Sequence, residues 1–481
     1  MHSTIRIFLF TFFTIISLSQ IWGQKILVSD ELNLKNDYTY DFIGAPDGNV
    51  LLFRDRAFSY EVNAFDEQMR LRWVRELDFQ KRKIDIVGST FQDTQFHIFY
   101  SFREGPERFL QVHSYDVNAF LKDSLTVFID RQLASGARWR FSKSENENKV
   151  VLFSPAENKQ VRFICFDVAA MQPQWDIQVP FADTLAGKDF KQMLVTNEGD
   201  MIMVLENYSG GLMKAKYHQE IWTYSPGWPE MQKLDIEVDE WVAQDARYVY
   251  DNRNQQLVGI SLIGEREAGR SKGILKVVIG NRLRKFVSQN IDMVDEELLQ
   301  ELYGQEGKVP KGLADFRLRD LVLTENGGVV VFMELIKEYS RKPTYPYSNI
   351  RNDGPLNLRR WVDFYHEDIL TIAYDVTGKR LWNTTLRKRQ YSQDDDGIFS
   401  SYYLFRTPSF VHLVYNDEIR NENTVSEYVL NGDGEFVRNS LLSTASQRLK
   451  LRFRDAIQTS ANSFVVPSER TNKLMLVKFI Y

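Results

Sequence analysis

A repeated two-strand unit constrains the fold of this chain more than any other feature. In its clearest copy, residues 369–386, an apolar strand leads to a turn with Asp375 and Gly378, and a second strand with Trp382 follows. Apolar strands joined by an Asp- and Gly-containing turn are typical of antiparallel β-hairpins. Altered copies recur along the chain, so the sequence predicts a repeat fold made of small antiparallel sheets.

Eight hairpins with short polar turns supply the count of repeats. Gly, Asn and Asp recur in these turns because they accept the positive φ of a tight turn. We assign each hairpin to the two inner strands, a and b, of a four-stranded blade. The hairpins span residues 42–53, 86–100, 139–153, 193–205, 248–262, 321–335, 402–414 and 456–466. The sequence therefore predicts an all-β, eight-bladed β-propeller, with seven blades as the alternative.

The outer hairpins, strands c and d, share an Asp and a Trp. Asp66 and Trp73 are separated like Asp375 and Trp382, and the next clear pair is one residue wider. We expect the Asp side chain to accept bonds from its turn, and the Trp to fill the wedge between neighbouring sheets. Because both residues recur with the repeat, we interpret them as structural and not catalytic.

The last repeat has no outer strand of its own after strand 474–481. A propeller must close, because an open ring leaves unpaired strand edges. Residues 25–28 form a strand-like segment outside any repeat, and we predict that they supply this missing strand. The predicted domain is then a single propeller over residues 24–481, with insertions at 291–314 and 337–366.

The outer hairpin resembles the repeat of quinoprotein-like propellers at four positions: Ala373, Asp375, Gly378 and Trp382. A second copy, residues 63–73, matches this repeat except that Met69 stands in place of the Gly. The family includes pyrroloquinoline-quinone dehydrogenases and the non-catalytic lipoprotein of the outer-membrane barrel-assembly machinery, and the resemblance implies a propeller. This chain lacks a vicinal cysteine pair and a lipid-anchoring cysteine, and we predict no bound cofactor.

The first 23 residues predict export. Arg6 precedes an apolar run, residues 7–18, and Gly23 offers the small residue that a signal peptidase requires. An uncleaved N-terminal anchor is the alternative. Cys165, the single cysteine, lies in an apolar strand and is predicted to be a buried, inert thiol. An exported chain without disulfides fits the bacterial periplasm or outer surface, and its composition resembles exported proteins of the Bacteroidota.

Several chemistries are disfavoured by the sequence. The net charge of −5 with mixed signs excludes a polycation for nucleic acid. The six histidines show no zinc spacing, and neither a GxSxG elbow nor a phosphate-binding glycine loop is present. Residues 394–397, DDDG, lack the alternating oxygens of a calcium loop and predict an acidic turn. We therefore predict no catalytic residue and no metal ligand.

The long connections predict a binding face. Strand direction alternates in a blade, so b–c loops and links between blades emerge together. These connections are residues 206–219, 264–273, 291–314, 337–366 and 387–399. Within them, residues 295–303 predict a helix with an acidic first turn. The candidate partner-binding residues are the Arg and aromatic residues of the fourth connection: Tyr339, Arg341, Tyr345, Tyr347, Arg351, Arg359, Arg360, Trp361 and Tyr365. The alternative is that this basic loop docks on the acidic helix.

These features favour a non-catalytic, exported scaffold or accessory subunit of a bacterial envelope assembly. The expected partner is a protein, with an outer-membrane or type IX secretion component as the first candidate. Association with a membrane would then pass through that partner, without a transmembrane segment after signal cleavage. Two other classes stay open: a glycan-active hydrolase or lyase with its site at the channel mouth, and a carbohydrate or ligand sensor module.

Overall fold

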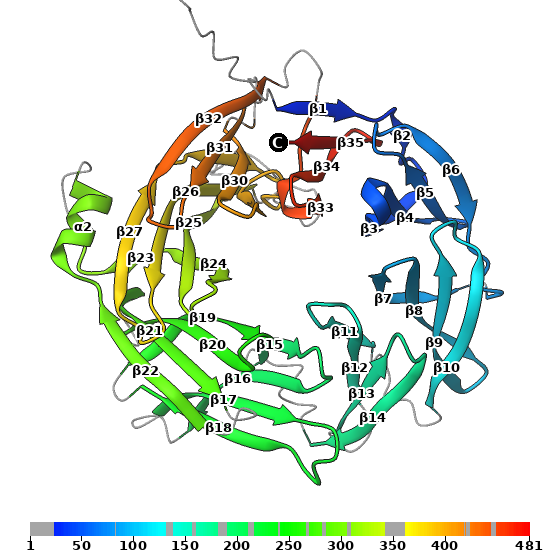
Figure 1. The fold of residues 1–481 in the computed structure, drawn as a ribbon, viewed down its shortest axis with the longest axis horizontal. Coiled ribbons are helices and arrows are strands. Elements are labelled where there is room, and N and C mark those ends of the chain that lie inside the picture. The colour runs from blue at the N-terminus through cyan, green and yellow to red at the C-terminus, as the bar shows by residue number, and fades with distance from the viewer. Residues whose placement is uncertain are drawn as a thin grey trace, which may run out of the picture.

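The computed structural model shows a closed ring of eight antiparallel sheets (Figure 1). It describes residues 24–81, 83–130, 138–155, 160–180, 190–209, 216–238, 241–265, 269–280, 285–304, 309–341, 361–417, 419, 424–443 and 449–481. The eight-bladed propeller is confirmed, and the seven-bladed alternative is wrong. The predicted signal peptide lies outside the described residues.

The first four blades each contain four strands in sequence order. Blade one is β3 (Asp37–Gly44), β4 (Val50–Arg56), β5 (Tyr60–Phe65) and β6 (Leu71–Glu76), with a 3-10 turn, η1 (Pro46–Gly48). Blade two is β7 (Asp85–Gln92), β8 (Gln95–Glu104), β9 (Glu107–Asp116) and β10 (Leu121–Asp130). Blade three is β11 (Arg140–Lys143), β12 (Lys149–Pro155), β13 (Val161–Asp167) and β14 (Gln172–Val179). Blade four is β15 (Phe190–Val195), β16 (Met201–Ser209), β17 (Lys216–Tyr224) and β18 (Gln232–Glu237).

The other four blades carry the additions to the repeat. Blade five is β19 (Val242–Asp251), β20 (Gln256–Gly264), β21 (Arg270–Gly280) and β22 (Lys285–Met293), with β23 (Leu313–Ala314) paired to β21. Blade six is β24 (Phe316–Leu323), β25 (Val329–Arg341), β26 (Trp361–Tyr374) and β27 (Arg380–Leu386), with β28 (Gln390–Gln393) paired to β26. Blade seven is β29 (Tyr402–Arg406), β30 (Val411–Asn416), β31 (Thr424–Leu430) and β32 (Phe436–Ser443). Blade eight is β33 (Ile457–Ser460), β34 (Ser463–Arg470), β35 (Lys473–Ile480) and β1 (Lys25–Val28), with η3 (Phe453–Asp455) before it and β2 (Leu32–Asn33) beside β35.

All eight predicted inner hairpins are confirmed as strands a and b of the eight blades. The second strand of each hairpin is packed on both faces by neighbouring blades. In β4, for example, the run from Val50 to Phe53 is buried without interruption. Such strands therefore appear in the sequence as continuous apolar runs and not as an alternation.

The Asp and Trp of the outer hairpins have the predicted structural roles. Asp375 Oδ1 accepts bonds from the backbone N–H of Thr377 at 2.8 Å and of Lys379 at 2.9 Å. The Trp382 indole donates to the carbonyl of Gly432 in the next blade at 2.9 Å. The Asp fixes the turn, and the Trp joins adjacent blades.

The ring closes where we predicted. Strand β1 pairs antiparallel with β35, and Lys25 lies opposite Ile480 while Val28 lies opposite Val477. The N-terminal strand thus becomes the outermost strand of blade eight, and Figure 1 shows β1 lying along β35. Neither edge of β35 is left open along this stretch, which removes the edge that an unclosed ring would expose.

The predicted acidic helix is α2 (Glu296–Tyr303). Asp295 caps it, because its Oδ1 accepts the backbone N–H of Leu298 at 2.8 Å. The apolar side of α2 packs into the core between blades five and six, and Arg387 donates to the carbonyls of Glu301 at 2.6 Å and Leu302 at 3.0 Å. A cation there complements the helix C-terminus. In the part of the chain that the structure describes, no helix is long and apolar enough to cross a bilayer.

All five predicted connections contain strand residues, and three of them correct the sequence interpretation most clearly. Pairing of β16 with β17 continues to Ser209 and Lys216, and pairing of β25 with β26 continues to Arg341 and Trp361. The link after blade six contains β28, a third strand beside β26. These segments are polar, and we therefore interpreted them as loops from the sequence. Cross-strand pairs, such as the ion pair between Arg341 and Asp363, stabilise them instead of apolar burial.

Candidate functional site

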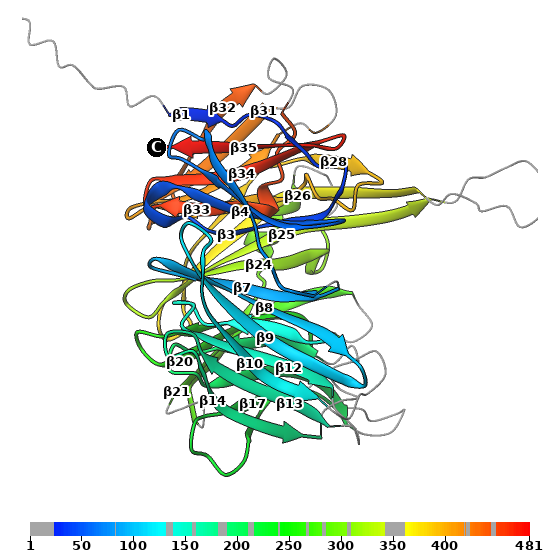
Figure 2. The ribbon, with the colours of Figure 1, turned by 90° about the vertical axis from the view of Figure 1, so that its right-hand side faces the viewer.

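Blade six projects beyond the ring as a three-stranded sheet, which we call the blade-six extension. It consists of residues 336–341 of β25, 361–366 of β26 and β28. Figure 2 shows β25 and β26 reaching past the neighbouring blades on one side of the propeller. The extension contains the described part of the predicted partner-binding insertion.

Four predicted partner-binding residues share one face of the extension, which we call its front face. In the register, Arg341 lies opposite Trp361, and Tyr365 lies directly opposite Lys337. Directly opposite residues point to the same side of a sheet, as do residues two apart on one strand. Tyr339 therefore belongs to this face too, and its side chain is 54% exposed.

The front face is an ordered row of aromatic rings. The ring of Tyr339 packs edge-on against Tyr365, with centroids 5.7 Å apart, and Tyr365 contacts Tyr391 at 4.9 Å. Beside them, Asp363 accepts bonds from Arg341 Nη2 at 2.6 Å and from the Tyr391 hydroxyl at 2.8 Å. These contacts fix the orientation of the Arg and Tyr side chains.

The other five predicted binding residues belong to the segment between β25 and β26. Tyr345, Tyr347, Arg351, Arg359 and Arg360 lie outside the described residues, as does any contact between that segment and α2. Within the described residues, α2 is contacted by groups of β27 and of the link that follows it.

The rear face of the extension is covered by the turn that follows β28. Phe364 and His366 are buried, and Gly397 lies against both. Asp394 Oδ1 accepts the backbone N–H of Val362 at 2.9 Å, and Asp395 Oδ1 accepts that of Gly397 at 3.0 Å. The acidic run thus folds as a turn that holds the extension against the ring.

A buried ion pair lies at the root of the extension. Lys388 Nζ lies 2.7 Å from Glu334 Oε1, and both side chains are fully buried. Lys388 also donates to the carbonyl of His366 at 3.0 Å and to Gln390 Oε1 at 2.8 Å, while Ser401 Oγ donates to Glu334 Oε2 at 2.7 Å. Three acceptors around one nitrogen match an ammonium group. Burial alone would raise the pKa of Glu334, but the Lys388 charge and His366 hold that pKa below its usual range.

His366 connects this ion pair to the channel of the propeller. Arg454 Nη2 lies 3.1 Å from His366 Nε2, and because an arginine can only donate, Nε2 is the acceptor. The proton of the neutral ring is therefore on Nδ1, 3.2 Å from Glu334 Oε2. Burial lowers the pKa of His366, which agrees with this neutral form. We call Glu334, Lys388, His366, Gln390 and Ser401 the root network.

Sequence reasoning missed the root network. Its members come from β25, β26, the link after β27, β28 and the residue before β29, so no short spacing joins them. The only signal was a single Glu within the apolar run from Val329 to Leu335 of β25, which is almost entirely buried. A charged residue at such a position requires a buried partner.

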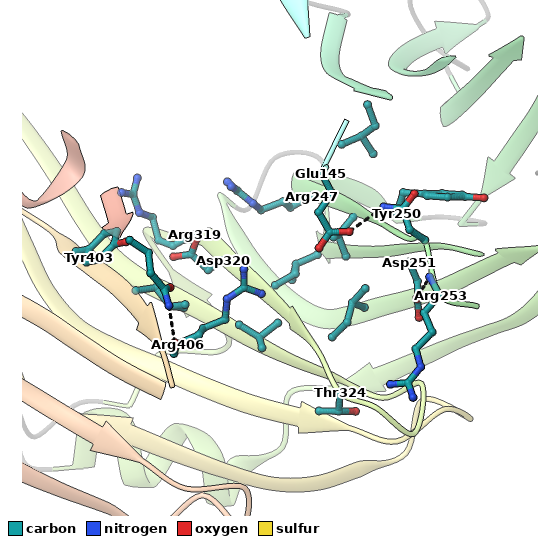
Figure 3. A pocket seen from close by; sticks show the side chains of 18 of the residues that line it. Glu145, Arg247, Tyr250, Asp251, Arg253, Arg319, Asp320, Thr324, Tyr403 and Arg406 are labelled. Carbon is teal, nitrogen blue, oxygen red and sulfur yellow. Dashed lines mark hydrogen bonds between the residues drawn. The ribbon is translucent and has the colours of Figure 1, made fainter. Parts of the chain in front are cut away.

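The central cavity of the propeller adjoins the root network. Its volume is about 940 Å³, and its walls come mainly from the innermost strands of blades three to eight. Figure 3 shows Arg247, Arg319 and Arg406 among the side chains that line it. Its charged residues are Lys143, Glu145, Arg247, Asp251, Arg253, Arg319, Asp320, Glu325, Arg406 and Arg454. Cations therefore outnumber carboxylates on this surface.

Two other potentially reactive sites, one at His218 and one at Cys165, are held by structural contacts. His218, Glu220 and Asp235 lie close enough to share a metal ion, but Lys233 Nζ lies 2.9 Å from Glu220 and 3.0 Å from Asp235. One ammonium group already pairs with both carboxylates. Cys165 is fully buried, as predicted, and burial raises the pKa of its thiol to about 12. At neutral pH it is protonated and unreactive.

Comparison with known proteins assigns no family to this chain. No protein-family model and no curated protein matches this chain. Among solved structures, the chain is similar to the β-propeller domain of the trilobed protease from Pyrococcus furiosus, at 10% identity and a TM-score of 0.40, over 85% of this chain and 98% of that one. It is also similar to prolyl oligopeptidase B from Galerina marginata, at 11% identity and a TM-score of 0.40, over 92% of this chain and 55% of that one. A eukaryotic initiation factor matches at 10% identity and a TM-score of 0.35, over 85% and 89% of the two chains.

Proposed function

We propose that this chain is a non-catalytic, exported scaffold protein that binds a protein partner through the front face of the blade-six extension. The observation that carries the proposal is the ordered row of Tyr339, Tyr365 and Tyr391 beside Arg341 on one projecting face. Tyr, Trp and Arg are the residues that contribute most to binding energy at protein interfaces.

The physical support is that the face is rigid while being exposed. Its strands are continuous with the ring, and its rear face is anchored by the turn after β28 and by the root network. Side chains that are already ordered lose little conformational entropy on binding. A partner surface with apolar groups and hydrogen-bond acceptors would fit the tyrosine row.

The exported location is part of the same proposal and rests on the N-terminal sequence. An outer-membrane or type IX secretion component is then the first class of partner to examine. The enzyme alternative gains nothing from the root network, because its carboxylate, Glu334, is fully buried and paired with Lys388. A group in that position cannot contact a substrate.

Site-specific crosslinking tests the scaffold function. A photoreactive residue replaces Tyr339 in one variant and Phe58 in another, and each is irradiated in intact cells. Phe58 is a matched control, because it is 93% exposed in the β4–β5 connection of blade one. We expect a defined protein adduct from position 339 only, identified by mass spectrometry in envelope fractions. Combining the probe with Tyr365→Ala and Arg341→Ala should reduce the adduct at least tenfold, because hot-spot truncations cost about 2 kcal/mol or more.

Two results would count against the scaffold. Recovery of the protein without any adduct at position 339 would remove the proposed interface. Equal adducts from positions 339 and 58 would show that the contact is not specific to the extension.

A further inference from the structure

The charged groups of the central cavity are unequally satisfied. Three of the four carboxylates are engaged within the protein, and Asp320 is the fourth: Asp251 Oδ1 accepts two backbone N–H groups of its own turn, Glu145 accepts from Asn252 at 2.8 Å, and Glu325 pairs with Arg253 at 3.4 Å. Among the described residues, Arg247, Arg406 and Arg454 have no carboxylate within ion-pair distance. The cavity therefore presents unneutralised positive charge.

Two arginines are held at one wall of this cavity beside the root network. Arg454 donates to His366 Nε2, and Arg319 Nε lies 3.5 Å from Glu334 Oε2. Glu334 is already shared by Lys388 and Ser401, and Arg319 Nε is buried without a hydrogen-bond acceptor among the described residues. Burial lowers the pKa of Arg454, and the charge of Arg319 lowers it further. Both guanidinium groups thus lie beside the pair formed by Glu334 and His366, at the same wall of the cavity.

We propose that the central cavity binds a small polyanion, a molecule with two or more carboxylate or phosphate groups, through Arg319 and Arg454, with Arg247 and Arg406 binding its other groups. Guanidinium groups match both oxyanions in geometry, and charge-assisted bonds are the strongest hydrogen bonds in proteins. The volume of about 940 Å³ suits a small molecule, since such pockets measure roughly 300–1,000 Å³. This site is separate from the front face of the extension and does not depend on the scaffold function.

Isothermal titration calorimetry tests this site with three probes: citrate, inorganic pyrophosphate and sorbitol. We expect the wild-type protein to bind citrate or pyrophosphate and not sorbitol, and to bind more weakly as sodium chloride is raised. Citrate binding alone would assign carboxylates as the recognised groups, and pyrophosphate binding alone would assign phosphates. Arg319→Gln and Arg454→Gln should each weaken binding about tenfold or more, because a bond to a charged group contributes about 1.5–3 kcal/mol.

Two further variants keep the test decisive. Arg406 lines the cavity outside the root network, and its carbonyl accepts from Gln458. Arg406→Gln should weaken binding several-fold without affecting folding, as checked by circular dichroism. Arg72→Gln removes the same charge from the exposed outer strand β6 and should leave binding unchanged. The proposal is overturned if neither anion binds the wild-type protein, or if Arg406→Gln and the folded wall variants bind as Arg72→Gln does.

Discussion

Replacing Lys388 with methionine is expected to lower the free energy of unfolding by about 3–5 kcal/mol, because it leaves the Glu334 carboxylate buried without its main counter-charge. The side chains of Glu334 and Lys388 are both fully buried, and Lys388 Nζ lies 2.7 Å from Glu334 Oε1. Lys388 also donates hydrogen bonds to the carbonyl of His366 and to Gln390 Oε1. Burial lowers the pKa of Lys388, and the attraction of Glu334 offsets this only in part. Chemical denaturation of the two proteins at pH 7 measures the difference.

The matched control is Lys473→Met, which removes a lysine from an exposed ion pair. Lys473 lies 2.5 Å from Glu31, with side chains 58% and 50% exposed. Exposed pairs contribute about 0–1 kcal/mol, so this variant should stay close to the wild-type protein. If Lys388→Met were as stable as Lys473→Met, Glu334 would have to be neutral or solvated, and the root network would be wrong.

Acidification is expected to destabilise the propeller between about pH 6.5 and pH 4, before most carboxylates titrate. His97 and His113 are buried in blade two, and burial lowers the pKa of each to about 4. An unfolded histidine has a pKa of about 6.5. Between these values the unfolded chain binds a proton that the native chain excludes, so stability falls as the pH falls. At 1.36 kcal/mol per pKa unit, the loss is roughly 3 kcal/mol for each histidine.

Denaturant unfolding at a series of pH values tests this window. His97→Gln and His113→Gln should each reduce the number of protons taken up on unfolding by up to one, whatever they do to stability at pH 7. His113→Gln also removes two contacts of the ring, with the Tyr100 hydroxyl at 2.7 Å and the Tyr115 hydroxyl at 2.9 Å. If the free energy of unfolding of both variants changed with pH as steeply as that of the wild-type protein, neither histidine would be excluded from protonation in the native state.

The ring was predictable because its signals are local. A turn such as that of Asp375 and Gly378 has one geometry, and eight inner hairpins fix the number of blades without any knowledge of long-range contacts. Closure followed from the physics of unpaired edges, which left the strand at Lys25 one place to pair. The helix after Asp295 was predictable from its acidic first turn.

The root network was not predictable, because its residues meet only in the folded state. Glu334, Lys388 and Arg454 are separated by tens of positions and come from different elements, so no spacing in the sequence connects them. The blade-six extension was half predicted: Tyr339 and Tyr365 were candidate residues, but a polar segment paired by ion pairs and rings looks like a loop in sequence.

Ring closure by the N-terminal strand is the central claim, and engineered cysteines test it most directly. Lys25 and Ile480 lie opposite each other in the β1–β35 ladder, where Cα atoms are about 4.5–5.5 Å apart and a disulfide can form. With Cys165→Ala as background, Lys25→Cys with Ile480→Cys should form an intramolecular disulfide in the native protein, identified by mass spectrometry of a non-reducing digest. Lys25→Cys with Lys285→Cys, in blade five, should not. Failure of the first pair to crosslink within one chain, while the protein is folded, would contradict the closed eight-bladed ring.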